Sequence, residues 1–382
     1  MFPTAWRIGS LRGIEVRVHY TWLLVAALVT WSFWSRFAVL SGFDEAPALA
    51  MAAAAALAFF ASILVHELAH ALEAQRRGLG VRSITLFLFG GVTESTRDAE
   101  RPVDELVMVG AGPLASFVLA AAFLAGSRAA DAVGWAAGGE VMGLVGWLNA
   151  ALGAFNLLPG APLDGGRILH SLVWWRTGDR DRARSVAARG GRVLGAVLVG
   201  AGLAQLLLVP GGLAGGLWLA FIGWFLMQAA RAEELQGEIL RALRGVTVRQ
   251  LLPRSQVSVP TTEPVAAAES LFWHGHADHL AVRGPDDVLE GVLSRDRVRA
   301  LDSGSRARTS VRELMVPVGD CPAVDADEPA SVLLERRAEP GAAVVVTHGG
   351  KPIAVLDPAQ IVAAIHRRAE LDGRPTRGRI PM

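Results

Sequence analysis

The chain has 382 residues, 52% of them hydrophobic, and a formal net charge of only +1 at pH 7. This balance gives no sign of the basic surface on which nucleic-acid-binding proteins depend, so nucleic acid is not expected as a partner. The single cysteine, Cys321, excludes an internal disulfide framework. Apolar runs are concentrated in residues 21–230 and stop there, which predicts a membrane domain followed by a soluble one.

Six segments are apolar for long enough to cross a bilayer, which takes about 20 mostly apolar residues. The predicted spans are 21–40, 47–73, 105–126, 142–159, 192–209 and 212–230. The fourth is short for a span, and the last two are separated only by a tight turn at Pro210-Gly211-Gly212. The sequence therefore predicts a polytopic α-helical membrane protein with about six transmembrane helices in residues 1–230.

Arginine residues set the predicted orientation of these spans. Residues 1–20, 74–104 and 160–191 are rich in arginine, whereas the alternate connecting segments hold almost none. Basic loops stay on the cytoplasmic side of a membrane. We therefore predict a multi-pass protein of the cell inner (plasma) membrane with both termini in the cytoplasm.

Residues 246–368 have the character of a soluble, cytoplasmic α/β domain, reached through a polar linker helix at 231–245. The domain divides into two similar halves. Each half begins with a Val-Arg-x-Leu turn, continues through an Ala-rich helix to two apolar β-runs and ends in a closing helix. The turns are at 248–251 and 311–314, and the β-runs are at 280–282, 291–293, 343–346 and 352–355. Such an internal repeat predicts two copies of one small unit packed together. Gly, Arg and Pro dominate residues 369–382, which predicts a disordered tail.

The residues that carry chemistry lie in the second predicted span, which contains His66-Glu67-Leu68-Ala69-His70. Positions four apart share one face of a helix, so both imidazoles can reach one ion while Glu67 points toward the same side. This is the H-E-x-x-H arrangement, in which two histidines bind zinc and the carboxylate takes a proton from a water at the metal. Each ionisable group at the centre of a membrane helix costs roughly 2.5–3.5 kcal/mol on insertion scales, so this group needs a compensating partner, and a metal is one.

A third protein ligand is required if one position is to stay open for water, and the apolar segments offer few carboxylates. Asp164 is the best placed, because the fourth span delivers it just past its inner end. His66 lies about 19 residues along the second span, roughly 28 Å from its start and at a similar level. Pro159 and Pro162 cannot continue a regular helix, so the chain must bend there, as a ligand loop requires. Glu73 is the rival ligand, and a helix cap or turn is the alternative role for Asp164.

Three motifs together resemble the site-2 proteases, the intramembrane zinc metalloproteases of regulated intramembrane proteolysis, and specifically the bacterial branch with a C-terminal pair of CBS domains. The motifs are His66–His70, the stretch from Asn156 through Pro159 to Leu163-Asp164-Gly165-Gly166, and Phe89-Gly90-Gly91-Val92. The resemblance implies a zinc metalloendopeptidase with one Zn²⁺ per chain and Asp164 as its third ligand. It also implies that Glu67 is catalytic and that Asn156 stabilises or orients the reacting carbonyl, as a donor to an oxyanion does. The alternative for Asn156 is a polar residue that forms hydrogen bonds within the helix bundle.

A β-hairpin is predicted near the membrane surface, where residues 83–92 alternate in polarity and then turn at two glycines. Irregular backbone at that depth must be buried in protein or line a cavity. By resemblance, the edge of the hairpin adds the substrate as an extra strand, and a purely structural hairpin is the alternative. Residues 110–114 also fit the family, but Ser116 stands where its members often carry Asn, and we expect small residues there to serve close helix packing.

Two other functions fit parts of the sequence. A membrane metal-ion transporter with a CBS regulatory domain would place ionisable groups on several spans, whereas here they concentrate at one site. An inactive pseudoprotease that only binds partners would not be expected to retain the whole His-Glu-His-Asp set. By resemblance, the substrate is a transmembrane regulatory protein such as an anti-sigma factor. The predicted outer loops at 41–46, 127–141 and 210–212 are too short to hold a PDZ domain that would select it.

The C-terminal repeat carries its own predictions. By resemblance, the CBS pair forms a homodimer and binds ATP or AMP at one site per chain at most. CBS modules that bind adenosine nucleotides place a Ser or Thr before an Asp at the end of the second strand. The first half offers Ser294-Arg295-Asp296, whereas the second half has Asp357 without the hydroxyl.

Three further histidines precede the first β-run of the repeat. They are His274, His276 and His279, and their spacing resembles a metal cluster. Their place directly before a β-run predicts a surface loop instead.

Overall fold

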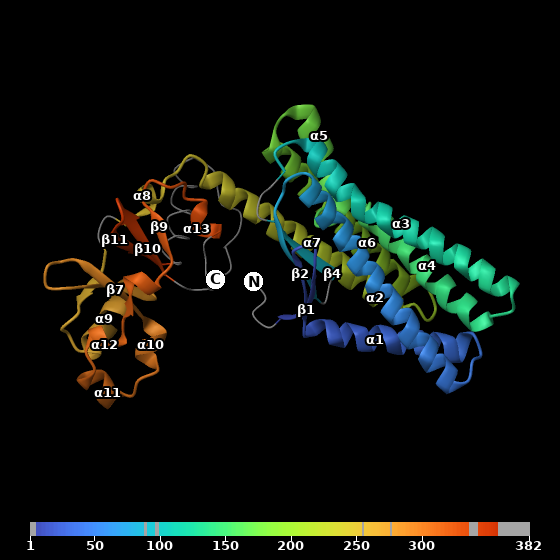
Figure 1. The fold of residues 1–382 in the computed structure, drawn as a ribbon, viewed down its shortest axis with the longest axis horizontal. Helices are drawn as coiled ribbons and strands as arrows, with labels where there is room; N and C mark the ends of the chain where they lie inside the picture. The colour runs from blue at the N-terminus through green and yellow to red at the C-terminus, as the bar shows by residue number, and fades with distance from the viewer. Residues whose placement is uncertain are drawn as a thin grey trace. The chain divides into compact units, whose positions relative to one another are not determined.

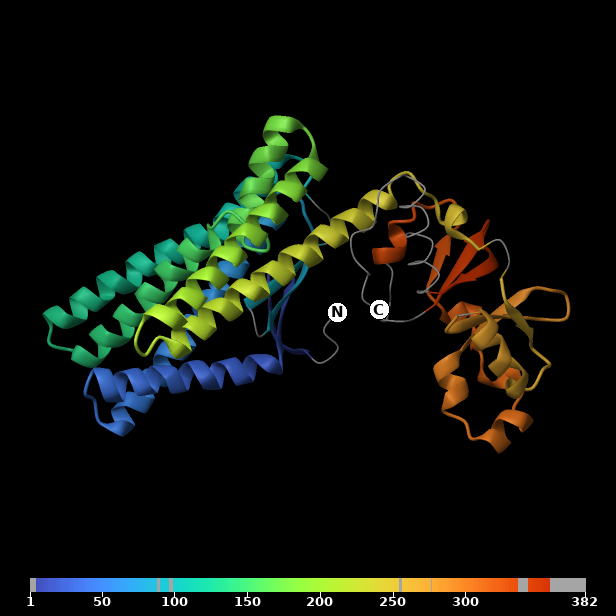
Figure 2. The same cartoon turned by 180° about the vertical axis from the view of Figure 1, so that it is seen from behind.

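The computed structural model describes residues 5–87, 90–95, 99–253, 256–275, 277–335 and 343–357 (Figures 1 and 2). The chain forms two compact units, Met1–Glu234 and Leu235–Met382. The predicted closing helix of the second repeat and the predicted tail at 369–382 lie outside the described residues.

Long helices make up most of the first unit. They are α1 (Thr21–Ser35) with the π-helical turn η1 (Arg36–Leu40), α2 (Glu45–Arg76), α3 (Pro102–Ala132), α4 (Ala136–Asn156), α5 (Asp164–Thr177), α6 (Arg180–Leu208) and α7 (Leu213–Ala242), whose residues from Leu235 onward belong to the second unit. Helices α3 and α4 run side by side in both views (Figures 1 and 2).

Within the described residues, five helices are long and apolar enough to cross a membrane: α1 with most of η1, α2, α3, α6 and α7. Helix α4 corresponds to the fourth predicted span, but its glycines and two asparagines lower its hydropathy, and it is not among the five. The polytopic helical fold is confirmed, and the count of six spans stays a prediction.

Helix α5, which the sequence patterns did not predict, follows the bend at the two prolines. Asp164 is its first residue, and Leu163 before it is extended, so the helix begins where the proline-containing loop ends. The helix ends at Thr177, and the next residue, Gly178, has a left-handed φ of 69°, which is common directly after a helix. The backbone N–H of Ala161 donates to the carbonyl of Ala187 on α6 over 3.1 Å. The loop that leads to Asp164 is therefore anchored on α6.

The predicted hairpin is part of a four-stranded sheet. The strands lie in the order β1 (Ala5–Leu11), β2 (Ile14–His19), β3 (Val81–Phe87) and β4 (Gly90–Ser95). β3 and β4 are antiparallel, which confirms the hairpin, while β2 pairs with β3 in parallel. The N-terminal strands were not predicted, and they join through Arg12-Gly13, whose φ values of 49° and 81° suit a tight hairpin turn. In the described part of the chain, β4 is an edge strand.

The sheet packs on α2 and α3 near the Arg76 end of α2. Ile14 on β2 and Ile84 on β3 are fully buried, and they share one core with Ala71 of α2 and Val109 of α3. Burial of apolar surface is the main favourable term in such packing, at roughly 25 cal/mol per Å². This shared apolar core holds the sheet against the part of α2 that carries the H-E-x-x-H motif.

The second unit is a tandem α/β repeat, as predicted. Its first half contains α8 (Val248–Leu251), β5 (Ser258–Pro260), α9 (Val265–Gly275), β6 (His279–Arg283), β7 (Leu289–Ser294), α10 (Arg295–Arg299) and α11 (Ser303–Arg308). Its second half contains α12 (Val311–Leu314), β8 (Val316–Pro317), the 3₁₀ turn η2 (Val318–Asp320), β9 (Ala323–Asp325), α13 (Val332–Glu335), β10 (Val344–His348) and β11 (Lys351–Leu356). In the first half, β5 and β6 are parallel, and β6 and β7 are antiparallel. In the second half, β9 and β10 are parallel, and β10 and β11 are antiparallel.

The two halves share a buried core. Ala281 and Val292 of the first half lie in one apolar cluster with Val345 and Val355 of the second. Each half therefore covers a face of the other half's sheet. Leu243, at the end of the preceding chain segment, is 2% exposed and belongs to the core of the second half.

Candidate metal centre

His66 and His70 lie on one face of α2, one turn apart, as the sequence predicts. Their Nε2 atoms are 3.2 Å apart. The Oδ2 atom of Asp164, at the start of α5, lies 3.1 Å from His66 Nε2 and 3.3 Å from His70 Nε2. His66 is only 3% exposed, so the cluster lies inside the helix bundle. The structure thus brings together the three residues that the sequence singles out as metal ligands.

The other ring nitrogens of both histidines contact α3. His70 Nδ1 lies 2.9 Å from the carbonyl oxygen of Met108. Because a carbonyl can only accept a hydrogen bond, Nδ1 is the donor, and in the neutral ring Nε2 keeps a lone pair for a metal. His66 Nδ1 lies 2.9 Å from the Oγ atom of Ser116. Contacts of this kind set the tautomer and the ring orientation of metal-binding histidines.

The donor atoms of the cluster suit a zinc ion. Two imidazole nitrogens and a carboxylate oxygen face one another at 3.1–3.3 Å, and such acceptors repel unless a cation or a shared proton lies among them. Tetrahedral zinc, with ligand bonds of about 2.0–2.2 Å, separates its ligand atoms by roughly 3.3–3.5 Å. Two imidazoles and a carboxylate also form a known ligand set of catalytic zinc sites. The residues present therefore fit the metal.

Gly112 on α3 leaves room for this cluster. A Cβ atom at this position would lie 2.2 Å from His70 Nε2 and 2.8 Å from His66 Nε2. Both separations are shorter than real Cβ contacts, so any side chain there would press on the two nitrogens. The absence of a side chain at Gly112 is thus a requirement of the site.

Glu67 is adjacent to the cluster and lies against strand β4. The Oγ1 atom of Thr93 donates to Glu67 Oε2 over 3.3 Å. A Cβ atom at Gly91 would lie 2.4 Å from Glu67 Cγ, so the backbone of β4 passes directly beside this side chain. The arrangement places a carboxylate next to both the histidine pair and the edge strand of the sheet.

The two other residues that the sequence singles out, Asn156 and Glu73, have surroundings that differ from each other. Asn156 is the half-buried last residue of α4, at the start of the loop that leads to Asp164. Glu73 forms ion pairs with Arg76 at 3.2 Å and with Arg77 at 3.1 Å. The charge of Glu73 is therefore compensated by two arginines at and directly after the end of α2, and Glu73 is not part of the His-His-Asp cluster.

Sequence reasoning missed three contributions from α3. Ser116 was expected to serve helix packing, but its hydroxyl also contacts a site histidine, so that expectation was incomplete. The contribution of Met108 comes from its main chain, which residue type does not reveal. Glu105, one turn before Met108, is buried and lies 2.8 Å from His170 of α5. The available signal was the helical spacing of these residues and Gly112, which places them on one face of α3.

A group of metal-binding residue types also occurs in the second unit. Asp325, Asp327 and His348 lie close together, but the last two are exposed. Arg249 Nε lies 3.0 Å from Asp327 Oδ1, and its guanidinium lowers the pKa of that carboxyl. Arg249 thus already compensates the charge of Asp327, and we regard these three residues as ordinary surface groups.

The histidines before the first β-run do not lie in one surface loop, because His274 belongs to helix α9. His279 begins β6, so the expectation of a surface loop was wrong for this residue. Its Nδ1 atom lies 3.0 Å from Oδ2 of Asp357, which is 1% exposed and also accepts from the backbone N–H of Asp278. His276 lies outside the described residues. His279 therefore joins the two repeats.

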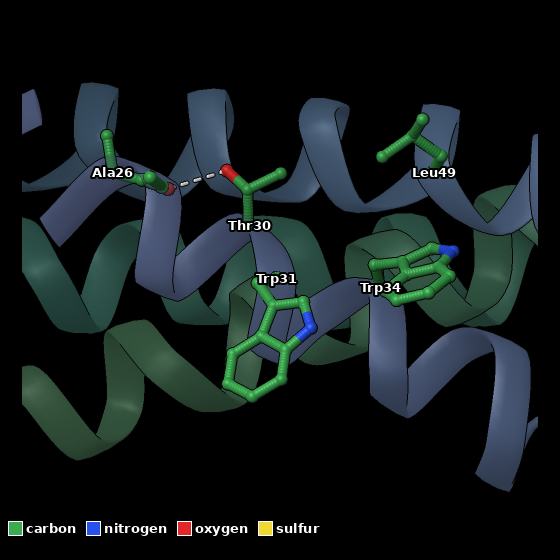
Figure 3. Close-up of a pocket in the computed structure, with 6 residues that line it drawn as sticks. Ala26, Thr30, Trp31, Trp34 and Leu49 are labelled. Carbon is green, nitrogen blue, oxygen red and sulfur yellow. Dashed lines mark hydrogen bonds between the residues drawn. The ribbon is translucent and has the colours of Figure 1, made fainter. Parts of the chain in front are cut away.

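A separate cavity of about 430 Å³ is lined by α1 and Leu49 of α2 (Figure 3). Trp31 and Trp34 contribute indole rings to it. Thr30 Oγ1 donates to the carbonyl of Ala26 over 2.7 Å, so its hydroxyl is satisfied within α1. The lining belongs to helices long and apolar enough to span a membrane, and it contains none of the residues of the candidate metal centre. An apolar surface of this kind suits contact with lipid and offers no group for chemistry.

Comparison with known proteins places these residues in a family. A protein-family sequence model, described as Peptidase family M50, matches residues 54–133 and 132–198. These residues include the whole candidate metal centre. Rip3 of Mycobacterium tuberculosis, named as a candidate zinc metalloprotease, is 36% identical over 366 residues, covering 94% of this chain and 92% of Rip3.

Two solved structures are similar to parts of this chain. The site-2 protease from Methanocaldococcus jannaschii is 23% identical and covers 60% of this chain and 95% of that chain, with a TM-score of 0.42. The CBS-domain containing protein ATU1752 from Agrobacterium tumefaciens is 18% identical and covers 32% of this chain and 96% of that chain, with a TM-score of 0.28. The similarity to Rip3 extends over nearly the whole chain. The chain therefore belongs to peptidase family M50, the site-2 protease family of intramembrane zinc metalloproteases.

Proposed function

We propose that His66, His70 and Asp164 hold one zinc ion per chain and form the catalytic centre of this intramembrane protease. The observation that carries the proposal is the convergence of two imidazole nitrogens and one carboxylate oxygen within 3.1–3.3 Å, between helices α2 and α5. When bound there, zinc supplies a Lewis acid that polarises the scissile carbonyl and makes water acidic enough to react near neutral pH.

Glu67 acts as the general base and then as the general acid. It takes the proton of the attacking water and delivers it to the leaving amine as the peptide bond breaks. The hydrogen bond from Thr93 restrains the carboxylate, so the proton acceptor keeps one position beside the histidine pair. Loss of a positioned general base typically costs about 10²–10⁴-fold in rate.

The substrate adds to the edge of β4 in an extended conformation. In the part of the chain that the structure describes, β4 pairs with β3 along one edge. Its residues Gly91 and Thr93 contact Glu67. A peptide that pairs with this edge gains main-chain hydrogen bonds, and its helix must unwind to do so. The scissile carbonyl is then held beside Glu67. Asn156 donates its side-chain amide to the carbonyl oxygen as negative charge develops there.

The protein cleaves transmembrane segments of membrane-bound regulatory proteins, of which anti-sigma factors are one class, in regulated intramembrane proteolysis. It lies in the cell inner membrane with both termini in the cytoplasm, which the arginine distribution supports. His70 lies six positions before the end of α2 at Arg76, or roughly 9 Å along the helix axis. The metal centre is therefore near the cytoplasmic surface in this orientation.

Residues 1–230 form the protease domain, residues 231–245 a linker helix and residues 246–368 a regulatory CBS pair. This pair dimerises and binds ATP or AMP at one site per chain at most. In the second half, Asp357 already accepts two hydrogen bonds from the first half. In the first half, Ser294 and Asp296 lie where β7 meets α10, and they remain the candidates for phosphate and ribose contacts.

The test is cleavage of a model transmembrane substrate by the full-length protein in liposomes. Glu67→Gln should abolish cleavage while zinc stays bound, because the amide cannot accept the proton. Phenanthroline should stop the wild-type reaction, and added zinc should restore it. Wild-type rates in Glu67→Gln would disprove the proposed role. Membrane proteomics of wild-type and Glu67→Gln strains would then identify the natural substrates as proteins that accumulate uncut in the variant.

A further inference from the structure

A second buried polar cluster joins α3 to α5, and the mechanism proposed above does not use it. Glu105 on α3 is 9% exposed. Its Oε2 atom accepts a hydrogen bond from Ser171 Oγ over 3.0 Å and lies 2.8 Å from His170 Nδ1. Its Oε1 atom lies 3.7 Å from Arg167 Nε. All three partners are on α5, the helix whose first residue is Asp164.

These contacts restrain how α5 sits against α3. A buried carboxylate is stable only while donors compensate it, so sliding or turning α5 would leave the charge of Glu105 unpaired. Ser171 and His170 are consecutive, and Arg167 is one turn earlier. The contacts therefore restrain both the rotation of α5 and its position along its axis.

The same face of α3 also contacts the two site histidines, which lie on α2. Met108 and Ser116 follow Glu105 at helical spacing, and each contacts an Nδ1 atom of one of those histidines. On α5, Ser171 lies two turns after Asp164 on the same face. One face of α3 thus reaches every member of the His-His-Asp cluster, the histidines directly and Asp164 through α5.

We infer that Glu105 is a positioning residue for the metal centre. It holds α5 so that the Oδ2 atom of Asp164 stays within 3.1–3.3 Å of both Nε2 atoms. The inference rests on the proposed role of Asp164 as a metal ligand. Glu105 is not a member of the His-His-Asp cluster, and it acts through helix α5.

The test uses full-length protein in detergent, loaded with cobalt(II) in place of zinc. The visible absorption bands of cobalt(II) report its coordination geometry, and competition with a chelator gives its dissociation constant. The variants are Glu105→Ala, Glu105→Gln and Ser171→Ala. Asp104→Ala is the matched control, because Asp104 is the neighbouring acid on α3 and pairs with Arg77 and Arg101 instead.

Glu105→Ala should shift the cobalt bands and weaken metal binding by about 10–100-fold, the usual cost of losing a group that orients metal ligands. Glu105→Gln should give a smaller effect, because its amide oxygen still accepts from Ser171. Asp104→Ala should match the wild type. A folded Glu105→Ala protein with wild-type bands and affinity overturns the inference. If that variant does not fold, wild-type behaviour of both Glu105→Gln and Ser171→Ala overturns it.

The same spectra separate this inference from the proposed function. Asp164→Ala should alter the cobalt bands directly. Unaltered bands in Asp164→Ala would remove the ligand role itself. Altered bands in Asp164→Ala together with unaltered bands in Glu105→Ala would remove only the positioning role.

Discussion

The Nδ1 atom of His66 lies 2.9 Å from the Oγ atom of Ser116, so a hydroxyl of α3 orients a histidine of α2. The two residues are 50 positions apart in the sequence. Met108 acts in the same way on His70 through its carbonyl group. Substitutions on α3 should therefore change metal binding without altering any proposed ligand.

Gly112→Ala should lose most of its bound zinc, because the added methyl group would lie 2.2 Å from His70 Nε2. A weakened helix would not explain the loss, since alanine favours a helix interior by about 1 kcal/mol over glycine. Gly110→Ala is the matched control, because no atom lies within 4 Å of a Cβ atom at that position. Metal analysis of both purified proteins makes the comparison, and equal zinc contents would contradict the site geometry.

Asp164→Ala should lose metal, whereas Glu73→Ala should keep one zinc per chain. The reason is that Asp164 faces both Nε2 atoms, while Glu73 is paired with Arg76 and Arg77. Elemental analysis of the dialysed proteins measures the difference. The opposite ranking would make Glu73 the third ligand. Substitution of His279 should leave the zinc content unchanged, because that histidine pairs with a buried aspartate of the repeat.

Reporter fusions should place the connecting segments on alternate sides of the membrane. Fusions after residues 100, 180 and 370 should report the cytoplasm, and fusions near 44, 134 and 211 should report the exterior. This follows from the retention of arginine-rich segments in the cytoplasm. An external signal at 180 would contradict the orientation, since it would put the loop after α5 on the side opposite to the arginine-rich end of α2.

A fragment of residues 235–382 should be a dimer that binds ATP or AMP weakly, at one site per chain at most. The fragment should begin before residue 246, because Leu243 is buried in the core of the second half. Sedimentation measures the dimer and calorimetry the nucleotide. A monomer at micromolar concentration, or two tight nucleotide sites, would refute this prediction. The rate of cleavage by the full chain could be unchanged both by added nucleotide and by deletion of the fragment. In that case the domain would bind partner proteins instead of regulating the protease.

The sequence predicted the parts of the site that depend on residue type and spacing. His66 and His70 are four apart on a helix, and Asp164 follows a bend enforced by prolines, so their convergence could be anticipated. The strands β1 and β2 were missed, although Ile14, Val16 and Val18 alternate with polar residues as a half-buried strand requires. The basic residues among them were interpreted only as a signal of membrane orientation.

The contacts that orient the site were harder to predict. The carbonyl of Met108 contacts His70, and any residue type could supply that group. The pairing of Glu105 with α5 depends on a helix that did not stand out, because α5 is short and follows directly from a loop. Such contacts depend on how helices pack, and a pattern along one helix does not specify its neighbour.

The interval of 98 positions between His66 and Asp164 has a consequence for biosynthesis. The nascent chain inserts α2 and its histidines long before α5 emerges from the ribosome. A chain interrupted before residue 164 lacks the third oxygen of the cluster and the helix that Glu105 holds. If Asp164 is the third ligand, as proposed, a chain interrupted before this residue should be inert toward the other proteins of the bilayer.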